Sequence, residues 1–263
     1  MRTIARILVL ALTFCAAFAA PTASWAKRCP DDSVQVGDVC VDKYEASVWS
    51  TTDIATVKKI QKGKIASALA LALATQHGAG SDDYGAGCPD TAAECTDYYA
   101  VSVFGVAPSA FPTQFQAMAA CRNAGKHLAT NLEWQAAALG TPDTGGTDNG
   151  TTDCNTDNLA PGVTSTGFRT GCVSDAGASD MVGNLYEWVA DWVPLSTACP
   201  GWAGFSDDDM CLSGASTTAN GPGALIHGGY FVNGAGAGPF AVNGLGGPTF
   251  SGGNLGFRCA RRL

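Results

Sequence analysis

The chain has 263 residues, of which 46% are hydrophobic and 14% are charged, and its formal net charge at pH 7 is −8. A chain of this length can bury a full hydrophobic core within one domain. The acidic balance excludes a nucleic-acid partner, because contact with phosphates needs a basic face, and it disfavours an anionic membrane surface.

The first 26 residues have the pattern of a secretory signal peptide. Arg2 and Arg6 supply a basic start, residues 7–20 are apolar, and Ser24-Trp25-Ala26 places small residues where signal peptidase reads them. Cleavage is therefore expected after Ala26, which leaves residues 27–263 as a single domain. The apolar run is too short to span a membrane, so we expect a secreted or periplasmic protein without membrane insertion.

Ten cysteines follow the predicted signal peptide. An even number of cysteines in an exported chain predicts disulfide bonds, although sequence alone allows many pairings. Short spacing along the chain favours four pairs and leaves the two remaining cysteines to each other. The predicted pairs are Cys29–Cys40, Cys88–Cys95, Cys154–Cys172, Cys199–Cys211 and Cys121–Cys259. If all ten cysteines pair, no thiol remains for catalysis or for binding a metal.

The predicted domain begins with a hairpin over residues 29–49, where residues 39–45 alternate apolar and polar side chains as a half-buried strand does. In residues 53–76, four lysines precede an alanine- and leucine-rich run at 65–75, which favours a helix. The lysines indicate a solvated face, with a basic docking patch as the alternative. Residues 78–98 are rich in glycine and aspartate, which indicates a loop.

Two helices carry clear start and stop signals. Each begins with a capping box, in which a threonine is followed three residues later by Gln or Glu, and each ends at a glycine. The capping and stop residues are Thr113 with Gln116 and Gly125, and Thr130 with Glu133 and Gly140.

Two long stretches show little periodicity. Residues 141–179 are mostly Gly, Thr, Asp and Asn, and an irregular stretch of this length is usually functional or held by a cross-link or metal. Residues 228–256 contain 11 glycines, which excludes a helix and allows only short strands.

Three separated segments resemble a known family. They are Asp180-Met181-Val182-Gly183-Asn184-Leu185-Tyr186-Glu187-Trp188, His227-Gly228-Gly229-Tyr230-Phe231 and Gly256-Phe257-Arg258-Cys259. In this order they resemble the formylglycine-generating enzyme (sulfatase-modifying factor) family, a variant of the C-type lectin fold. The resemblance implies an α+β fold with a twisted, mainly antiparallel sheet, two capped helices and many ordered loops. It also supports the pair Cys121–Cys259 and marks residues at about 50–100 as a helical and loop insertion.

The resemblance further implies calcium. Calcium prefers carboxylates and backbone carbonyls gathered on a turn. The ligands carried over from the family are Asp180, Gly183, Leu185 and Glu187, and a second site begins at Asn155 and Thr156. The alternative is a structural role for Glu187 as a buried carboxylate hydrogen-bonded to backbone amides.

The family's oxidase chemistry depends on two cysteines that bind copper(I), and this chain lacks both. Counting forward from His227-Gly228-Gly229, the two positions fall on Asn233 and Gly238. Copper(I) selects soft thiolates, and neither an amide nor a glycine can bind it or exchange disulfides. We therefore expect no copper and no formylglycine-generating activity.

Aromatic and asparagine residues remain around these positions. Such side chains on rigid turns provide large contact area and adaptable hydrogen bonds, which predicts a ligand-binding pocket. The predicted pocket residues are Tyr186, Tyr230, Phe231, Asn233, Phe240 and Asn243. The same segment resembles the ligand-binding region of retroelement-diversified receptors. The alternative for each aromatic side chain is a place in the core.

The sequence therefore predicts a secreted, non-catalytic, calcium-stabilised module that binds a protein, a peptide or a glycan. One alternative is a divergent enzyme that uses Glu187, Tyr186 or His227, since some periplasmic relatives act in siderophore maturation without the cysteine pair. A structural cell-surface protein without a discrete pocket is the other alternative.

Overall fold

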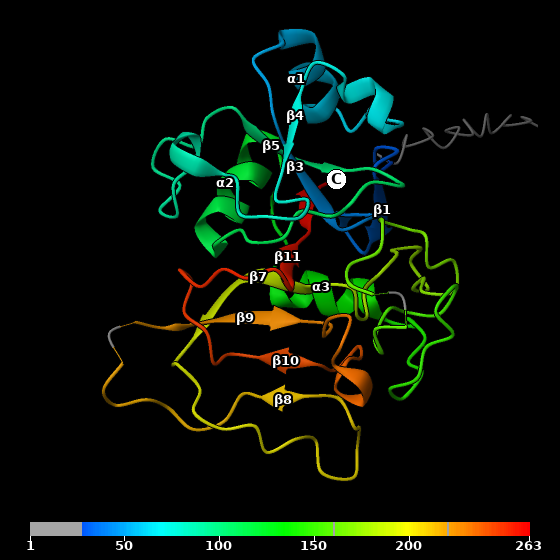
Figure 1. Cartoon of the computed structure of the whole chain (residues 1–263), viewed down its shortest axis with the longest axis vertical. Coiled ribbons are helices and arrows are strands. Elements are labelled where there is room, and N and C mark those ends of the chain that lie inside the picture. Colours follow the sequence, from blue (N-terminus) through cyan, green and yellow to red (C-terminus); the bar gives the residue numbers. More distant parts are fainter. Residues whose placement is uncertain (1–27, 160, 220) are drawn as a thin grey trace, which may run out of the picture.

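The structure is a computed structural model that describes residues 28–159, 161–219 and 221–263 (Figure 1). The predicted signal peptide, residues 1–26, lies outside the described residues. Within those ranges, no helix has the length and apolar character needed to cross a bilayer. The described residues contain three α-helices and twelve strands. The strands form three sheets, and their pairing is mainly antiparallel, as predicted.

The first sheet brings together the two ends of the described chain. Its strand order is β1-β2-β12-β6 and all of its pairs are antiparallel. The predicted N-terminal hairpin is confirmed by β1 and β2, in which Val36 faces Val39. The four strands are β1 (Ser33–Val36), β2 (Val39–Asp42), β6 (His127–Leu128) and β12 (Cys259–Arg262).

The second sheet unites the three segments that carry the family resemblance. Its order is β11-β7-β9-β10-β8, and β7 pairs in parallel with β11 and antiparallel with β9. Glu187 therefore lies opposite His227 on one side and Gly256 on the other. The five strands are β7 (Tyr186–Val193), β8 (Met210–Cys211), β9 (Gly223–His227), β10 (Val242–Asn243) and β11 (Leu255–Phe257).

The third sheet lies at the opposite end of the molecule from β8, next to α1 (Ile54–Gln61) (Figure 1). It contains β3 (Ala46–Ser50), β4 (Thr75–His77) and β5 (Tyr98–Ser102) in the order β4-β3-β5. The four lysines predicted to form a solvated face are all exposed: Lys58, Lys59, Lys62 and Lys64.

The prediction of a helix over residues 65–75 is wrong. The helix lies earlier, where Asp53 caps α1 by accepting a hydrogen bond from the Thr56 amide at 2.7 Å. Within 65–75 only Ala68–Leu71 form a 3₁₀ turn. Leu71 is buried, whereas Leu69 and Leu73 point into solvent, so the apolar side chains share no single face. Helix propensity is a weak preference that such packing overrides.

The two predicted helices are confirmed as α2 (Gln114–Asn123) and α3 (Asn131–Ala138). Both capping boxes form, with Thr113 at the start of α2 and Thr130 at the start of α3. α2 packs against β5, β6 and β7, and α3 packs against β1, β2 and β7. The two helices therefore pack against strands of all three sheets.

All five predicted disulfide pairs are present: Cys29–Cys40, Cys88–Cys95, Cys121–Cys259, Cys154–Cys172 and Cys199–Cys211. Cys121–Cys259 joins α2 to β12 across 138 residues of sequence. Cys154–Cys172 holds the irregular stretch 141–179, where no strand of more than an isolated bridge forms among the described residues. The glycine-rich stretch 228–256 contributes to the short strands β10 and β11, as predicted, and it also contains a 3₁₀ turn at Gly234–Gly236.

Candidate functional site

Glu187 lies in β7 with 1% of its surface exposed, and protein donors occupy both of its carboxylate oxygens. Arg258 donates from Nε to Oε2 at 2.7 Å and from Nη2 to Oε1 at 2.6 Å. Trp134 Nε1 donates to Oε2 at 2.7 Å. The guanidinium also donates to the backbone carbonyls of Asp42 and Ser179. The carboxylate is thus held by side-chain donors from Arg258 and Trp134.

Two further buried carboxylates lie beside this ion pair. Glu45 accepts hydrogen bonds from Asn184 Nδ2 at 2.6 Å and from the Leu185 amide at 3.2 Å. Asp180 Oδ2 accepts from the Gly167 amide at 2.7 Å, while Oδ1 has no hydrogen-bond partner among the described residues. Burial raises the pKa of Glu45 well above its usual range and that of Asp180 to about 6. No sequence motif marks Glu45, and the sequence prediction did not include it.

The second predicted calcium segment packs against the first. The Asn155 carbonyl accepts a hydrogen bond from the Asn184 amide at 2.8 Å, and Asn155 Oδ1 accepts from the buried Arg169 at 3.1 Å. The Thr156 carbonyl accepts from the Gly234 amide at 2.8 Å. Thr156 Oγ1 has no partner in the part of the chain that the structure describes.

Calcium takes about six to eight oxygen ligands, so its site needs oxygens that protein donors leave free. A guanidinium already supplies positive charge at both predicted segments, Arg258 at Glu187 and Arg169 at Asn155. In this arrangement both Glu187 oxygens are engaged by protein donors, and the assignment of calcium to the two segments stays a prediction. Asp180 Oδ1 accepts no hydrogen bond from the described residues, so it is the oxygen through which metal binding at the first segment can be tested.

His227 is buried in β9 and stacks on Trp134, with the ring centroids 4.7 Å apart. Its Nδ1 donates to the Ala241 carbonyl at 3.1 Å. Burial lowers the pKa of His227 to about 4, because a charged imidazole would lose its solvation, so the ring is neutral at pH 7. Like Glu187, His227 is 1% exposed and has no access to a substrate in solution.

Asp208 and Asp209 lie next to the two positions at which the family resemblance places cysteines. Asn233 Nδ2 donates to Asp209 Oδ2 at 2.9 Å, and the Tyr186 hydroxyl donates to the same oxygen at 3.3 Å. Asp208 packs so closely on Gly238 that a Cβ atom at this glycine would overlap the Asp208 carboxylate. Carboxylates therefore adjoin both positions at which the family has thiols.

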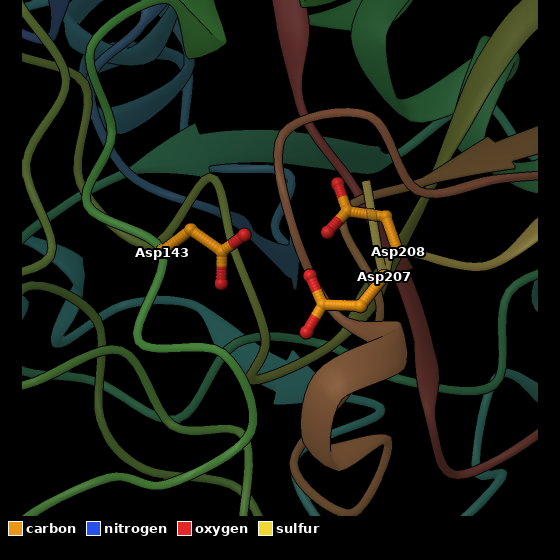
Figure 2. Close-up of side chains that lie close together, drawn as sticks. All are labelled: Asp143, Asp207 and Asp208. Carbon is orange, nitrogen blue, oxygen red and sulfur yellow. The ribbon is translucent and has the colours of Figure 1, made fainter. Parts of the chain in front are cut away.

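Asp207 and Asp208 also converge with Asp143, which follows α3, and Figure 2 shows the three carboxylates turned toward one another. One oxygen from each lies within 4.8 Å of the others. Asp208 Oδ2 accepts a hydrogen bond from the Phe240 amide at 2.7 Å. Burial, together with the nearby Asp143 carboxylate, raises the pKa of Asp208 to about 6. The sequence prediction missed this cluster, although the run of three aspartates was visible.

The structure distributes the six predicted pocket residues over three places. The first is an aromatic group, in which Tyr230 lies 5.3 Å from Tyr186 and 5.4 Å from Phe231 between ring centroids. Asn233 supports this group by accepting a hydrogen bond from the Tyr230 amide at 3.0 Å. Tyr186 is buried, whereas Tyr230 and Phe231 are partly exposed.

The second place, which we call the Phe250 cavity, has a volume of about 340 Å³ and includes Tyr186, Trp188, Asn243, Phe250 and Asn254 in its lining. Phe250 is 51% exposed at its edge. Asn243 Oδ1 accepts a hydrogen bond from the Leu245 amide at 2.8 Å, and its NH₂ group does not take part in that bond. The cavity therefore combines aromatic faces with side-chain amides.

The third place, which we call the Phe240 cavity, has a volume of about 480 Å³ and includes Trp202, Phe205, Leu139 and Phe240 in its lining. The Phe205 ring centroid lies 5.0 Å from that of Phe240, and Phe205 is 67% exposed. Trp202 Nε1 donates to the Phe240 carbonyl at 3.0 Å. This apolar surface lies next to the aspartate cluster, because Asp208 accepts from the Phe240 amide.

Comparison with known proteins finds one matching family model and several similar solved structures. The sulfatase-modifying factor enzyme 1-like domain matches residues 106–263. No curated protein matches the chain at a significant level. Among solved structures, the Major Tropism Determinant M1 variant is 16% identical with a TM-score of 0.51, and the match covers 90% of this chain and 54% of that one.

Two further structures are similar. The Major Tropism Determinant P3c variant is 18% identical with a TM-score of 0.50, over 89% of this chain and 53% of that one. PvdO from Pseudomonas aeruginosa is 14% identical with a TM-score of 0.39, over 90% of this chain and 100% of that one. The chain spans about half the length of the Major Tropism Determinant variants it matches. Their likeness shows the α+β, C-type lectin-like fold.

Proposed function

The chain belongs to the sulfatase-modifying factor enzyme 1-like domain family, and we propose that it acts within that family as an exported binding module for a protein, a peptide or a glycan. The observation that carries this proposal is the Phe250 cavity, whose volume of about 340 Å³ and mixed lining suit a ligand with apolar and polar groups. Aromatic faces bind such ligands at small entropic cost, and amides fix their orientation.

The chemistry of the neighbouring positions supports a non-catalytic role. Asn233 and Gly238 stand where the family's oxidase needs thiols, and Asp209 and Asp208 lie against them. Glu187, one residue proposed for the alternative enzyme, is engaged by Arg258 and is buried. The arrangement therefore favours recognition over acid–base catalysis by these residues.

We propose that residues 27–263 form one domain outside the cytoplasm. Its N-terminal strands β1 and β2 belong to the same sheet as the C-terminal strand β12, which places both ends in one unit. Five disulfides favour the periplasm or the extracellular space, where thiols oxidise. The 50–100 segment runs between β3 and β5 and contains α1 and β4, and it lies outside the matched residues and is proposed as an insertion.

The proposal is tested by screening the protein against a random peptide library and a glycan array. We expect ligands from one of them to bind the parent protein and to lose about tenfold or more in affinity on Phe250→Ala. Phe104→Ala is the matched control, because Phe104 is also exposed (52%) but packs on Tyr44 and Phe168 outside both cavities. Ligands that bind Phe250→Ala as well as the parent would disprove the Phe250 cavity as the site.

A further inference from the structure

We propose that Asp143, Asp207 and Asp208 form a binding site for a divalent cation, and that calcium is the ion it takes. This site, which we call the aspartate site, is separate from the segments at Asp180–Glu187 and Asn155–Thr156. It stands on the convergence of three carboxylates and on one buried oxygen that nothing in the described chain satisfies.

The three carboxylates come from two loops, one after α3 and one before β8 (Figure 2). An oxygen of each lies within 4.8 Å of the others, a spacing that one ion can bridge. No lysine, arginine or histidine of residues 28–159, 161–219 and 221–263 forms an ion pair with any of them. The negative charge therefore has no compensation from the described protein, unlike that of Glu187.

Asp208 distinguishes this cluster from an ordinary acidic surface. It is 1% exposed, and its Oδ2 is fixed by the Phe240 amide at 2.7 Å. Its Oδ1 accepts no hydrogen bond from an N–H or hydroxyl donor of the described residues, and burial of an uncompensated carboxylate oxygen is costly. Gly238 leaves the space that this carboxylate occupies. A cation bound between the carboxylates would compensate the buried charge of Asp208 and remove the repulsion from Asp143.

The donor set indicates which ion would bind. Three carboxylates are hard oxygen ligands, whereas copper(I) selects thiolates. Asp143 and Asp207 are exposed, so water can complete the coordination shell. Ligands on two loops suit calcium, which accepts flexible geometry, better than magnesium, which demands a near-octahedral arrangement and dehydrates reluctantly.

Bound calcium would also link the two loops beside the Phe240 cavity. Asp143 is fixed to its own loop, because its Oδ1 accepts a hydrogen bond from the Gly145 amide at 2.9 Å. Asp208 is fixed to the backbone of Phe240, which lines that cavity. The ion would thus hold the Phe240 loop in place against the loop that follows α3.

The test is calorimetric titration of calcium into the chelator-treated full chain. We expect one site that prefers calcium to magnesium, with affinity about tenfold or more weaker in Asp207→Asn and Asp208→Asn. Gly238→Ala should weaken binding equally, because its methyl group displaces the Asp208 carboxylate without removing a charge. Asp38→Asn, at an exposed aspartate in the β1–β2 turn, is the charge-matched control and should bind as the parent does.

Three results would overturn the aspartate site. They are an absence of calcium binding by the parent protein, unchanged binding in all three site variants, and loss of binding in Asp180→Asn alone. The last result would place calcium at the segment that the family resemblance marks. Circular dichroism of each variant confirms that it is folded, and Asp207→Asn, at an exposed residue, provides a readout if a buried substitution disturbs folding.

Discussion

At the scale of single residues, burial decides which charges this molecule carries. His227 stacks on Trp134 and is neutral at pH 7, whereas Arg258 keeps its charge inside the core because Glu187 pairs with it. The sequence identified Glu187 and Arg258 from their motifs. It did not reveal that they bind each other, since they are 71 residues apart and only the parallel pairing of β7 with β11 brings their strands together.

His227 gives a prediction for stability against pH. Its folded pKa of about 4 lies below its value of 6.5 in an unfolded chain, so the unfolded state takes up the proton first as pH falls. The stability that neutral His227 contributes to the folded state is present above pH 6.5 and is lost as the pH falls from 6.5 to 4. His227→Asn retains a donor for the Ala241 carbonyl but does not titrate.

We therefore expect the free energy of unfolding of the parent, relative to His227→Asn, to fall by about 2 kcal/mol from pH 7 to pH 4.5. Urea denaturation at each pH measures this difference, in which the opposing effects of the raised carboxylate pKa values cancel. Parallel pH profiles for the two proteins would show that His227 does not bind its proton preferentially in the unfolded state.

At the scale of elements, signals within a few residues of sequence were sufficient to predict α2 and α3. Structure that depends on contacts between distant residues was not predicted. Both capping boxes form because a threonine and a Gln or Glu three residues later satisfy each other's backbone within one turn. The helix predicted at 65–75 fails because Leu71 packs into the core while Leu69 and Leu73 do not. Which side chains of that run are buried depends on tertiary contacts that its own composition does not specify.

The α3 cap gives the second prediction. Thr130 Oγ1 accepts a hydrogen bond from the Glu133 amide at 3.3 Å, and Glu133 returns one to the Thr130 amide at 2.8 Å. Thr130→Ala should lower the free energy of unfolding by about 1 kcal/mol, because a helix N–H loses its acceptor. Thr130→Ser keeps the hydroxyl and should lose only a few tenths. Equal losses in the two variants, measured by urea denaturation, would argue for lost methyl packing instead.

At the scale of the whole molecule, pairing of all ten cysteines was predictable because four pairs are local and the fifth remains. The aspartate cluster was not predictable, because Asp143 and Asp208 are joined only by the folding of two irregular loops. Glu45 is similar: it contacts Asn184 across 139 residues of sequence. Both contacts join residues that are far apart in sequence, and no periodic pattern in the sequence indicates them.

The disulfides give the third prediction. The two cysteines are 138 positions apart in Cys121–Cys259 and 7 positions apart in Cys88–Cys95, so the first bond restricts the unfolded chain far more. In the loop-entropy account, replacing both cysteines by alanine should cost about 5 kcal/mol for the long loop and about 2 kcal/mol for the short one. Guanidinium denaturation of the two double variants measures the difference. Equal losses would mean that local packing outweighs chain entropy.

The close contact between Gly238 and Asp208 also decides what residue 238 can accommodate. A Cβ atom at this position would overlap the Asp208 carboxylate, so any larger residue there requires that carboxylate to move. An engineered thiol at residue 238 would therefore be combined with a smaller side chain at residue 208, and the two substitutions should be energetically coupled.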